Sequence, residues 1–243
     1  MKILGSIALL GALMILGGCA ATQVAISKHE LVVQNKMSES VFLTPTADKS
    51  IYVEVRNTTD KPGFNFDAQV KSAIERRGYH VVTNPDEAHF MLQANVLQVG
   101  QSSQTASQAG FGGGFGSPLD GALTGVAAAA VLNNNIGGRG LGAIGLAAGA
   151  ADFIAGSMVK DVYYSAIVDI QISERTKATV HVSGDQDLSQ GASGGEHVSY
   201  DETSNFKRYR TRVLSSANKV NLKWEDAEPV IISGLAQSVS GIF

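Results

Sequence analysis

Alternating apolar and polar positions in the first half of the chain predict four short strands and one helix. The strands are predicted over 41–43, 51–55, 79–82 and 90–99, and the second of them alternates most clearly. Between the second and third strands, Val70, Ala73 and Ile74 recur at helical spacing. Asn65 or Asp67 is the candidate N-cap of this helix, and Gly78 is its predicted stop. The order β-β-α-β-β predicts a small α/β unit.

The last third of the chain predicts the other half of the same domain. Residues 162–172 alternate like one long strand, and residues 178–182 and 206–214 are predicted to pair with it around a polar loop over 183–205. Pro229 is predicted to open a final helix, whose apolar face carries Ile232, Leu235, Val239 and Ile242. The predicted class is α+β: a mixed α/β periplasmic domain with an insertion between its halves.

The insertion consists of two glycine- and alanine-rich apolar segments, 119–132 and 141–159, separated by a polar run of turn-forming residues over 133–140. This pattern predicts a helical hairpin. The Ser-, Gln- and Gly-rich residues before it cannot bury much apolar surface, so 101–118 is predicted to be a flexible linker. The predicted division of the chain is 1–18 (signal peptide), 19–100 (first half of the domain), 101–118, 119–159 (hairpin) and 160–243 (second half).

Three interpretations of the hairpin are open. Gly140, Gly142 and Gly145 match a dinucleotide-binding loop, but no strand enters these glycines, which speaks against that interpretation. Alanine-rich helices can also form the core of a soluble domain. The membrane interpretation rests on length, since helices of 14 and 19 residues reach about 21 and about 28 Å at roughly 1.5 Å per residue. These lengths bracket the apolar band of an outer membrane, roughly 25 Å.

One face of the second apolar segment favours a membrane hairpin that packs against other helices. A stripe of small residues with one carboxylate runs along it: Gly138, Gly142, Gly145, Gly149, Asp152 and Gly156. Gly121 and Gly125 repeat this spacing in the first segment. Helices associate in lipid through close approach at small residues, and a carboxylate there must face a neighbour or water. We therefore expect many copies side by side, with the turn Asn133, Asn134, Asn135 and Arg139 exposed.

The first residues predict export and lipid attachment. Lys2 precedes an apolar run over 3–16, and the small residues Gly17 and Gly18 then precede Cys19, the only cysteine. This arrangement resembles the bacterial lipobox, whose cysteine carries a diacylglycerol and an acyl chain such as palmitate. Because Ala20 follows the cysteine in place of Asp, the sorting pattern favours the outer membrane. The alternative is an ordinary signal peptide with an incidental cysteine.

Composition and scattered motifs give no support for catalysis. Without Lys2, 18 basic and 22 acidic residues remain, a formal charge of about −4, which offers no argument for nucleic-acid binding. Ser193 stands in a G-x-S-x-G match, but this match lies in low-complexity sequence without the strand and helix that a nucleophile elbow requires. The five histidines, and the pair Asp185 and Asp187, lack a metal-ligand spacing. The sequence predicts no enzyme, no metal and no cofactor apart from the covalent lipid on Cys19.

Several stretches together resemble one family, the TraT lipoproteins of conjugative plasmids. The matching runs are 37–39, 93–97, 158–162, 169–180 and 211–223, and the lipobox and hairpin occupy corresponding places. The runs E-R-T-K-A-T-V and A-N-K-V-N-L-K are the most specific, and the resemblance covers almost the whole mature chain. The linker 101–117 is where we expect the strongest departure.

The resemblance implies an abundant, oligomeric outer-membrane lipoprotein that acts without catalysis. Such proteins reduce DNA uptake from donor cells with related plasmids, which is surface exclusion, and reduce killing by complement. The implied partners are further copies of the chain in a ring, outer-membrane lipid, and the donor's mating apparatus or complement components. Two alternatives stay open: a periplasm-facing envelope assembly or structural lipoprotein, and an oligomeric outer-membrane export channel.

Overall fold

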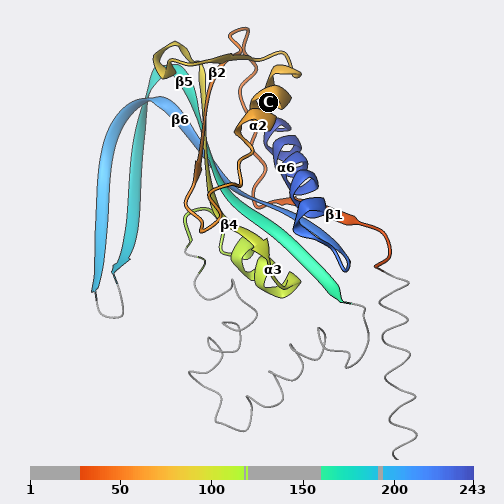
Figure 1. Ribbon diagram of the computed structural model, residues 1–243. Coiled ribbons are helices and arrows are strands. Elements are labelled where there is room, and N and C mark those ends of the chain that lie inside the picture. Colours follow the sequence, from red (N-terminus) through yellow and green to blue (C-terminus); the bar gives the residue numbers. More distant parts are fainter. Residues whose placement is uncertain (1–27, 118, 120–159, 191–193) are drawn as a thin grey trace, which may run out of the picture.

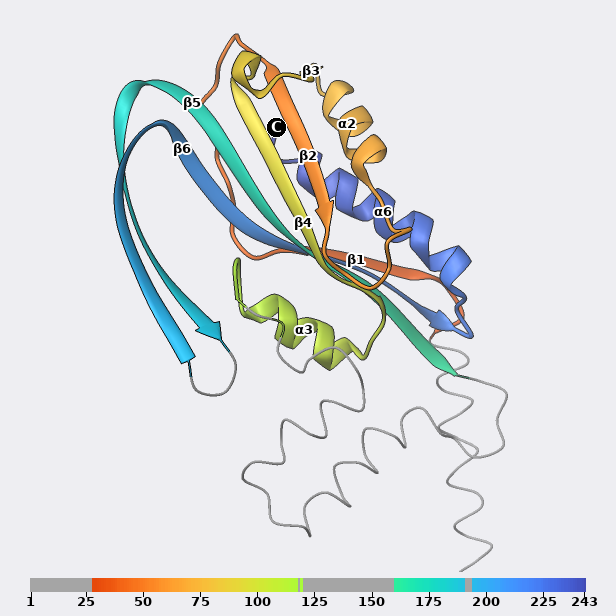
Figure 2. The same cartoon turned by 60° about the vertical axis from the view of Figure 1, so that its left-hand side comes forward.

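A computed structural model of the chain describes residues 28–117, 119, 160–190 and 194–243, with the backbone alone over 182–202. Six strands form one sheet in the order β1-β6-β5-β4-β2-β3. Helices α2 and α6 lie side by side on one face of this sheet, and α3 lies on the other (Figures 1 and 2). The predicted mixture of helix and sheet is therefore present. The predicted membrane hairpin lies outside the described residues.

The strands that form the sheet are β1 (Val32–Met37), β2 (Ser50–Asn57), β3 (His80–Val82), β4 (Phe90–Gln101), β5 (Asp161–Gln190) and β6 (Gly194–Val220). Strand β2 pairs in parallel with β3 and β4, and the pairs β4–β5, β5–β6 and β1–β6 are antiparallel. The helices are α2 (Asp67–Glu75), α3 (Gln104–Gly112), α6 (Trp224–Ser240) and a short 3-10 turn η1 (Pro85–Glu87).

The main core lies between the sheet and the pair α2 and α6. Alternate residues of β4 and β5, including Leu92, Val96 and Ile170, face Ile74 of α2 and Leu235 of α6. Burial of such side chains stabilises the fold by roughly 1.5–3 kcal/mol each. Val70, Ala73 and Ile74 are buried, as the helical spacing predicted. Gly78 follows this helix with a φ of 85°, the left-handed conformation that suits glycine at a helix stop.

Four sequence predictions were wrong in their boundaries or type. Residues 41–43 form no strand, and the unpredicted edge strand β1 precedes them. Helix α3 occupies half of the range 101–118 that was predicted as a flexible linker. Helix α6 begins at Trp224, so Pro229 lies inside it and does not open it. The predicted loop over 183–205 is instead made mostly of the outer parts of β5 and β6, which pair with each other.

Gly234 lets α6 approach the sheet closely. A Cβ at this position would lie 2.3 Å from the Asn35 Oδ1 and 2.6 Å from the Ser215 Oγ, and Ser215 is fully buried. We expect Gly234→Val to lower the free energy of unfolding by about 1–3 kcal/mol, because overpacking forces the helix or its neighbours to shift. Chemical denaturation measures this change. Gly63→Ala is the matched control, since a Cβ there meets nothing within 4 Å; equal losses for both variants would contradict the close approach.

Candidate functional site: the anchorage of the inserted segment

The chain enters and leaves the inserted segment at two points that are held by hydrogen bonds to the sheet. Ser117 precedes the segment, and Lys160 follows it. The lipidation residue, the small-residue stripe and the hairpin turn predicted above all lie outside the described residues. The described part of the site is therefore the anchorage on either side of the segment.

The entry is held by a buried ion pair between neighbouring strands. Arg212 of β6 lies directly opposite Asp169 of β5, and their side chains are 0% and 9% exposed. The Arg212 Nε donates to one Asp169 oxygen at 2.6 Å, and its Nη2 donates to the other at 3.0 Å. This bidentate geometry is the strongest arrangement for an arginine and a carboxylate.

The same arginine also binds the backbone of the segment that leads into the insertion. Its Nη1 donates to the Gly110 carbonyl near the end of α3 at 2.7 Å, and its Nη2 donates to the Ser117 carbonyl at 2.9 Å. Gly116, with a φ of 76°, directs its N–H toward Asp169 at 2.8 Å. A cation at the carboxyl end of a helix also interacts favourably with the helix dipole. The ion pair thus fixes both α3 and the residues after it.

A group of hydroxyls fixes the rest of α3 to the sheet. The Ser102, Ser107 and Ser165 hydroxyls lie 2.6–2.9 Å from one another, and Ser107 and Ser165 are fully buried. Ser103 caps the helix by accepting from the Ala106 N–H at 3.0 Å. Burial raises the pKa of Tyr163, whose side chain also hydrogen-bonds with Ser107 and Ser216. The interface of α3 with the sheet is therefore held largely by polar contacts.

The exit lies at the same end of β6 as the first described residue. The Asn221 side chain accepts from the Lys160 N–H at 3.0 Å, and the Asn221 N–H donates to the Lys160 carbonyl at 2.8 Å. The neighbouring Val220 N–H donates to the Lys28 carbonyl at 3.0 Å. Lys28 also contacts Asn218, which donates to Asp161 at 2.6 Å. Lys28 and Lys160 therefore flank the same end of β6, Lys28 on the side of β1 and Lys160 on the side of β5.

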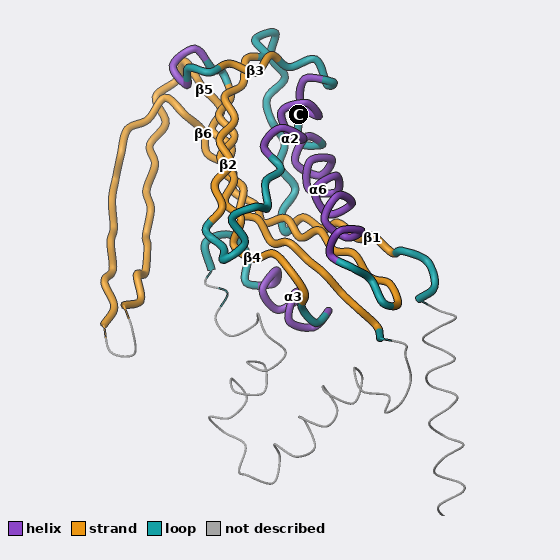
Figure 3. Tube along the Cα trace, viewed as in Figure 1, coloured by secondary structure: helices purple, strands orange, loops and turns teal. Residues whose placement is uncertain are grey.

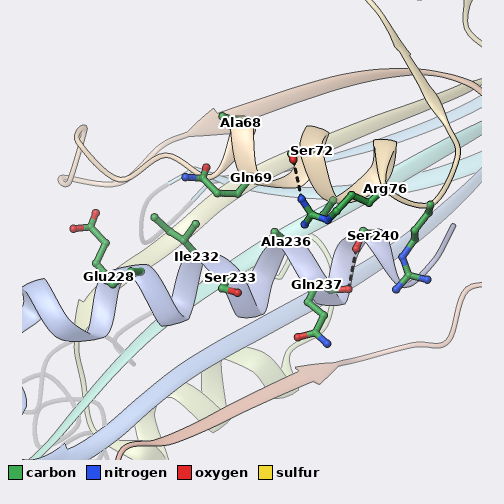
Figure 4. Close-up of a pocket in the computed structure, with 13 residues that line it drawn as sticks. Ala68, Gln69, Ser72, Arg76, Glu228, Ile232, Ser233, Ala236, Gln237 and Ser240 are labelled. Atoms are coloured by element: carbon green, nitrogen blue, oxygen red, sulfur yellow. Dashed lines mark hydrogen bonds between the residues drawn. The ribbon is translucent and has the colours of Figure 1, made fainter.

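A second feature is an open groove of about 1050 Å³ between α2 and α6 (Figure 4). Small side chains such as Ser72, Ser233 and Ala236 line it, with Arg76 and Glu228 at its margin. The Arg76 Nη1 donates to the Ser72 hydroxyl at 2.8 Å. The groove holds no arrangement of an acid, a base and a nucleophile.

The described residues include neither a membrane-spanning helix nor a cluster of metal ligands. No helix among residues 28–117, 160–190 and 194–243 is long and apolar enough to cross a membrane. Within the same ranges, no three His, Cys, Asp or Glu side chains converge as they would around a metal ion.

Comparison with known proteins decides the family. A family model described as the enterobacterial TraT complement resistance protein matches residues 30–243. The chain belongs to the TraT family. Two proteins of Escherichia coli named TraT complement resistance protein, one of them from strain K12, are each 41% identical to it over 244 and 243 residues. The alignments cover 100% and 99% of this chain, and 99% and 98% of those relatives.

More distant matches are weaker. A TraT complement resistance protein of Wigglesworthia glossinidia brevipalpis is 24% identical over 234 residues, which cover 93% of this chain and 90% of that relative. Among solved structures, a PelC dodecamer from Paraburkholderia phytofirmans matches 88% of this chain and 94% of its own, with 9% identity and a TM-score of 0.25. That score is too low to carry an argument about the TraT chain. The family resemblance seen in the sequence is confirmed by the family model and by the relatives from Escherichia coli.

Proposed function

We propose that this TraT family member is a lipid-anchored outer-membrane protein that confers complement resistance and surface exclusion as a ring of identical copies. Family membership supports complement resistance, because the family and its relatives in Escherichia coli are named for it. The observation that carries the membrane placement is the meeting of Lys28 and Lys160 at one end of β6. The lipid-bearing end and the apolar insertion can then enter the same membrane.

The length of chain between Cys19 and Lys28 agrees with this arrangement. Lys28 lies nine positions after Cys19, and an extended chain covers at most about 3.6 Å per residue, or roughly 32 Å. A diacylglycerol and an N-acyl chain supply more than the two lipid signals that stable anchoring requires. The lipid would hold the sheet near the membrane while the anchorage described above directs the inserted segment into it.

The proposed action requires no bond to be made or broken. A ring that is plugged into the outer membrane presents exposed turns that obstruct a mating apparatus from a donor cell or a pore-forming complement assembly. Alanine and glycine bind lipid weakly, so the hairpin gains its stability from identical neighbours. Catalysis plays no part in this proposal, and neither a metal nor a diffusible cofactor is needed.

The test compares isogenic cells with and without the gene in two assays. We expect expression to increase survival in serum, and to reduce DNA uptake from donors that carry a related plasmid. Heat-inactivated serum and an unrelated plasmid are the controls. Serum survival or DNA uptake that is the same with and without the gene would contradict the proposal.

Two other assays separate the alternatives. A steady open current across planar bilayers would favour an export channel over a plugged ring. A hairpin turn that stays inaccessible on intact cells would favour a periplasm-facing assembly lipoprotein.

A further inference from the structure

The outer parts of β5 and β6 form a two-stranded ribbon with both edges open. Strand β5 pairs with β4 only as far as Glu174, and β6 pairs with β1 only between Val213 and Asn218. Beyond them, β5 and β6 pair with each other alone, from Val180 opposite Ser204 to Gln190 opposite Gly194 (Figure 3). A two-stranded ribbon by itself is marginally stable in water, and long open edges are templates for pairing with another chain.

The base of the ribbon is firmly fixed to the body. The Arg175 Nε donates to the Ala88 carbonyl at 3.0 Å, and its guanidinium carbon lies 4.7 Å from the centre of the Phe206 ring. The Tyr209 hydroxyl donates to the Glu174 carboxylate at 2.8 Å. The ribbon therefore leaves the sheet in a defined direction.

The pKa values of Tyr209 and Glu174 agree with a firm attachment of the ribbon to the body. Burial, together with the Glu174 carboxylate beside it, raises the pKa of Tyr209 to about 12. Burial opposes ionisation of Glu174, but hydrogen bonds from Tyr209 and Thr44 outweigh it and hold the pKa of Glu174 below its usual value. The contribution of Glu174 to stability is therefore present at neutral pH, and it is lost only as the pH falls through that lowered pKa.

The ribbon is strongly acidic by sequence. Residues 182–202 include five acidic residues and no Lys or Arg. Like charges disfavour pairing between two such ribbons. A partner surface for it should therefore be polar and positively charged.

The face of the sheet beside α3 provides such a surface, which we call the polar trough. It is a hollow of about 310 Å³, and the residues that define it are Glu54, Arg56, Thr58, Gln93, Ala94, Asn95, Phe115, Asp169 and Gln171. Arg210 stands at its rim, where its guanidinium carbon lies 5.2 Å from the centre of the Phe115 ring. Arg212 neutralises Asp169, and Arg56 pairs with Glu54 at 2.7 Å, so the guanidinium of Arg210 leaves the trough with a net positive charge.

The floor of the trough is a ladder of donors and acceptors across four strands. Arg210 donates to Gln171 at 3.0 Å, Gln171 to Gln93 at 3.2 Å, and Gln93 to Glu54 at 3.1 Å. The buried Asn95 Oδ1 has no hydrogen-bond partner among the described residues. An open strand edge presents unpaired N–H and C=O groups, which such a floor can bind. The α2/α6 groove offers no comparable ladder.

We propose that the ribbon of one copy lies in the polar trough of the neighbouring copy. This inference rests on the proposed function, because it assumes the ring and names the surfaces that build it. Ribbon and trough are different surfaces, so the contact is heterologous, and a heterologous contact closes a ring when the rotation from copy to copy returns to its start.

The test exchanges charges in the full-length lipidated protein in detergent. We expect Arg56→Glu with Arg210→Glu to raise the dissociation constant between subunits about tenfold or more, because attraction becomes repulsion. Asp201→Lys with Glu202→Lys should do the same. The combination of all four should restore most of the affinity. Native mass spectrometry over a dilution series measures each value, and thermal unfolding followed by circular dichroism checks that each variant is folded.

Neutral and control variants make the result decisive. Arg56→Gln with Arg210→Gln should weaken association in the same direction by less, and added salt should weaken the wild type but not this variant. Arg76→Glu with Arg77→Glu reverses charge at the α2/α6 groove and should have no effect. An unchanged dissociation constant in folded trough variants would overturn the ribbon contact while leaving the ring intact. The same conclusion would follow if Arg76→Glu with Arg77→Glu restored the affinity of the ribbon variant. A wild-type protein that is monomeric would instead overturn the proposed function.

Discussion

Replacing Arg212 with methionine is expected to lower the free energy of unfolding by about 3–5 kcal/mol, the usual cost of removing one partner from a buried ion pair. The substitution would leave the Asp169 carboxylate buried without its cation, and with the hydrogen bond from the Gly116 N–H. It would also leave the Gly110 and Ser117 carbonyls without their charged donor. Helix α3 and the entry to the inserted segment should therefore loosen before the rest of the sheet.

Chemical denaturation measures the total loss, and hydrogen exchange at α3 locates it. Arg76→Met is the control, because Arg76 lies on the exposed surface of α2 and its removal should cost less than about 0.5 kcal/mol. Adding Asp169→Asn to Arg212→Met should recover part of the loss, since no uncompensated charge then remains buried. A small loss for Arg212→Met, or no recovery in the double variant, would show that the pair does not secure the anchorage.

Replacing Cys19 with serine is expected to abolish outer-membrane placement and, with it, protection from complement. Without the thiol no lipid can be attached, and the anchor that supplies roughly 0.8 kcal/mol for each buried methylene is lost. Serum survival should fall to that of cells without the gene. Density fractionation of membranes, combined with incorporation of labelled palmitate, measures the placement and the lipid directly.

Ala20→Ser is a suitable control, because it keeps both the thiol and a small residue after it. This variant should be acylated and protect cells like the wild type. If the Cys19→Ser protein still fractionates with the outer membrane and still protects, the inserted segment alone anchors the chain and the lipid is dispensable.

Helix α2 and strands β2 and β4 could be predicted from sequence because each has a single periodicity that matches one buried face. In β4, Phe90, Leu92, Ala94 and Val96 are buried and alternate with half-buried residues, so apolar burial alone determines the element. The same holds for Val70, Ala73 and Ile74 in α2.

The hydrophobic pattern of the sequence did not predict the elements that lack a large apolar face. Helix α3 is held by serine hydroxyls and by the Arg212 guanidinium, and its buried Ala106, Ser107 and Gly110 are too small to show a hydrophobic pattern. The capping residue Ser103 was the one local signal for this helix. The edge strand β1 is mostly exposed, and the ribbon pairs only with itself, so neither shows the alternation that one-sided burial produces.

The anchorage could not be found from sequence because its partners are far apart along the chain. Asp169 and Arg212 each occupy a polar position in an alternating strand, which by itself predicts a solvent-exposed side chain. Only the register of β5 against β6 places them opposite each other beneath α3. Lys28 and Lys160 likewise become neighbours only through Val220 and Asn221.

We propose that the apolar insertion crosses into the outer membrane from the anchored end of the sheet. Labelling of an introduced cysteine at Asn134 on intact cells, with a maleimide that cannot cross the outer membrane, tests it most directly. We expect Asn134→Cys to react on intact cells, whereas Lys223→Cys, at the start of α6, should react only after the membrane is permeabilised. An Asn134→Cys protein that stays unreactive until permeabilisation would contradict the account.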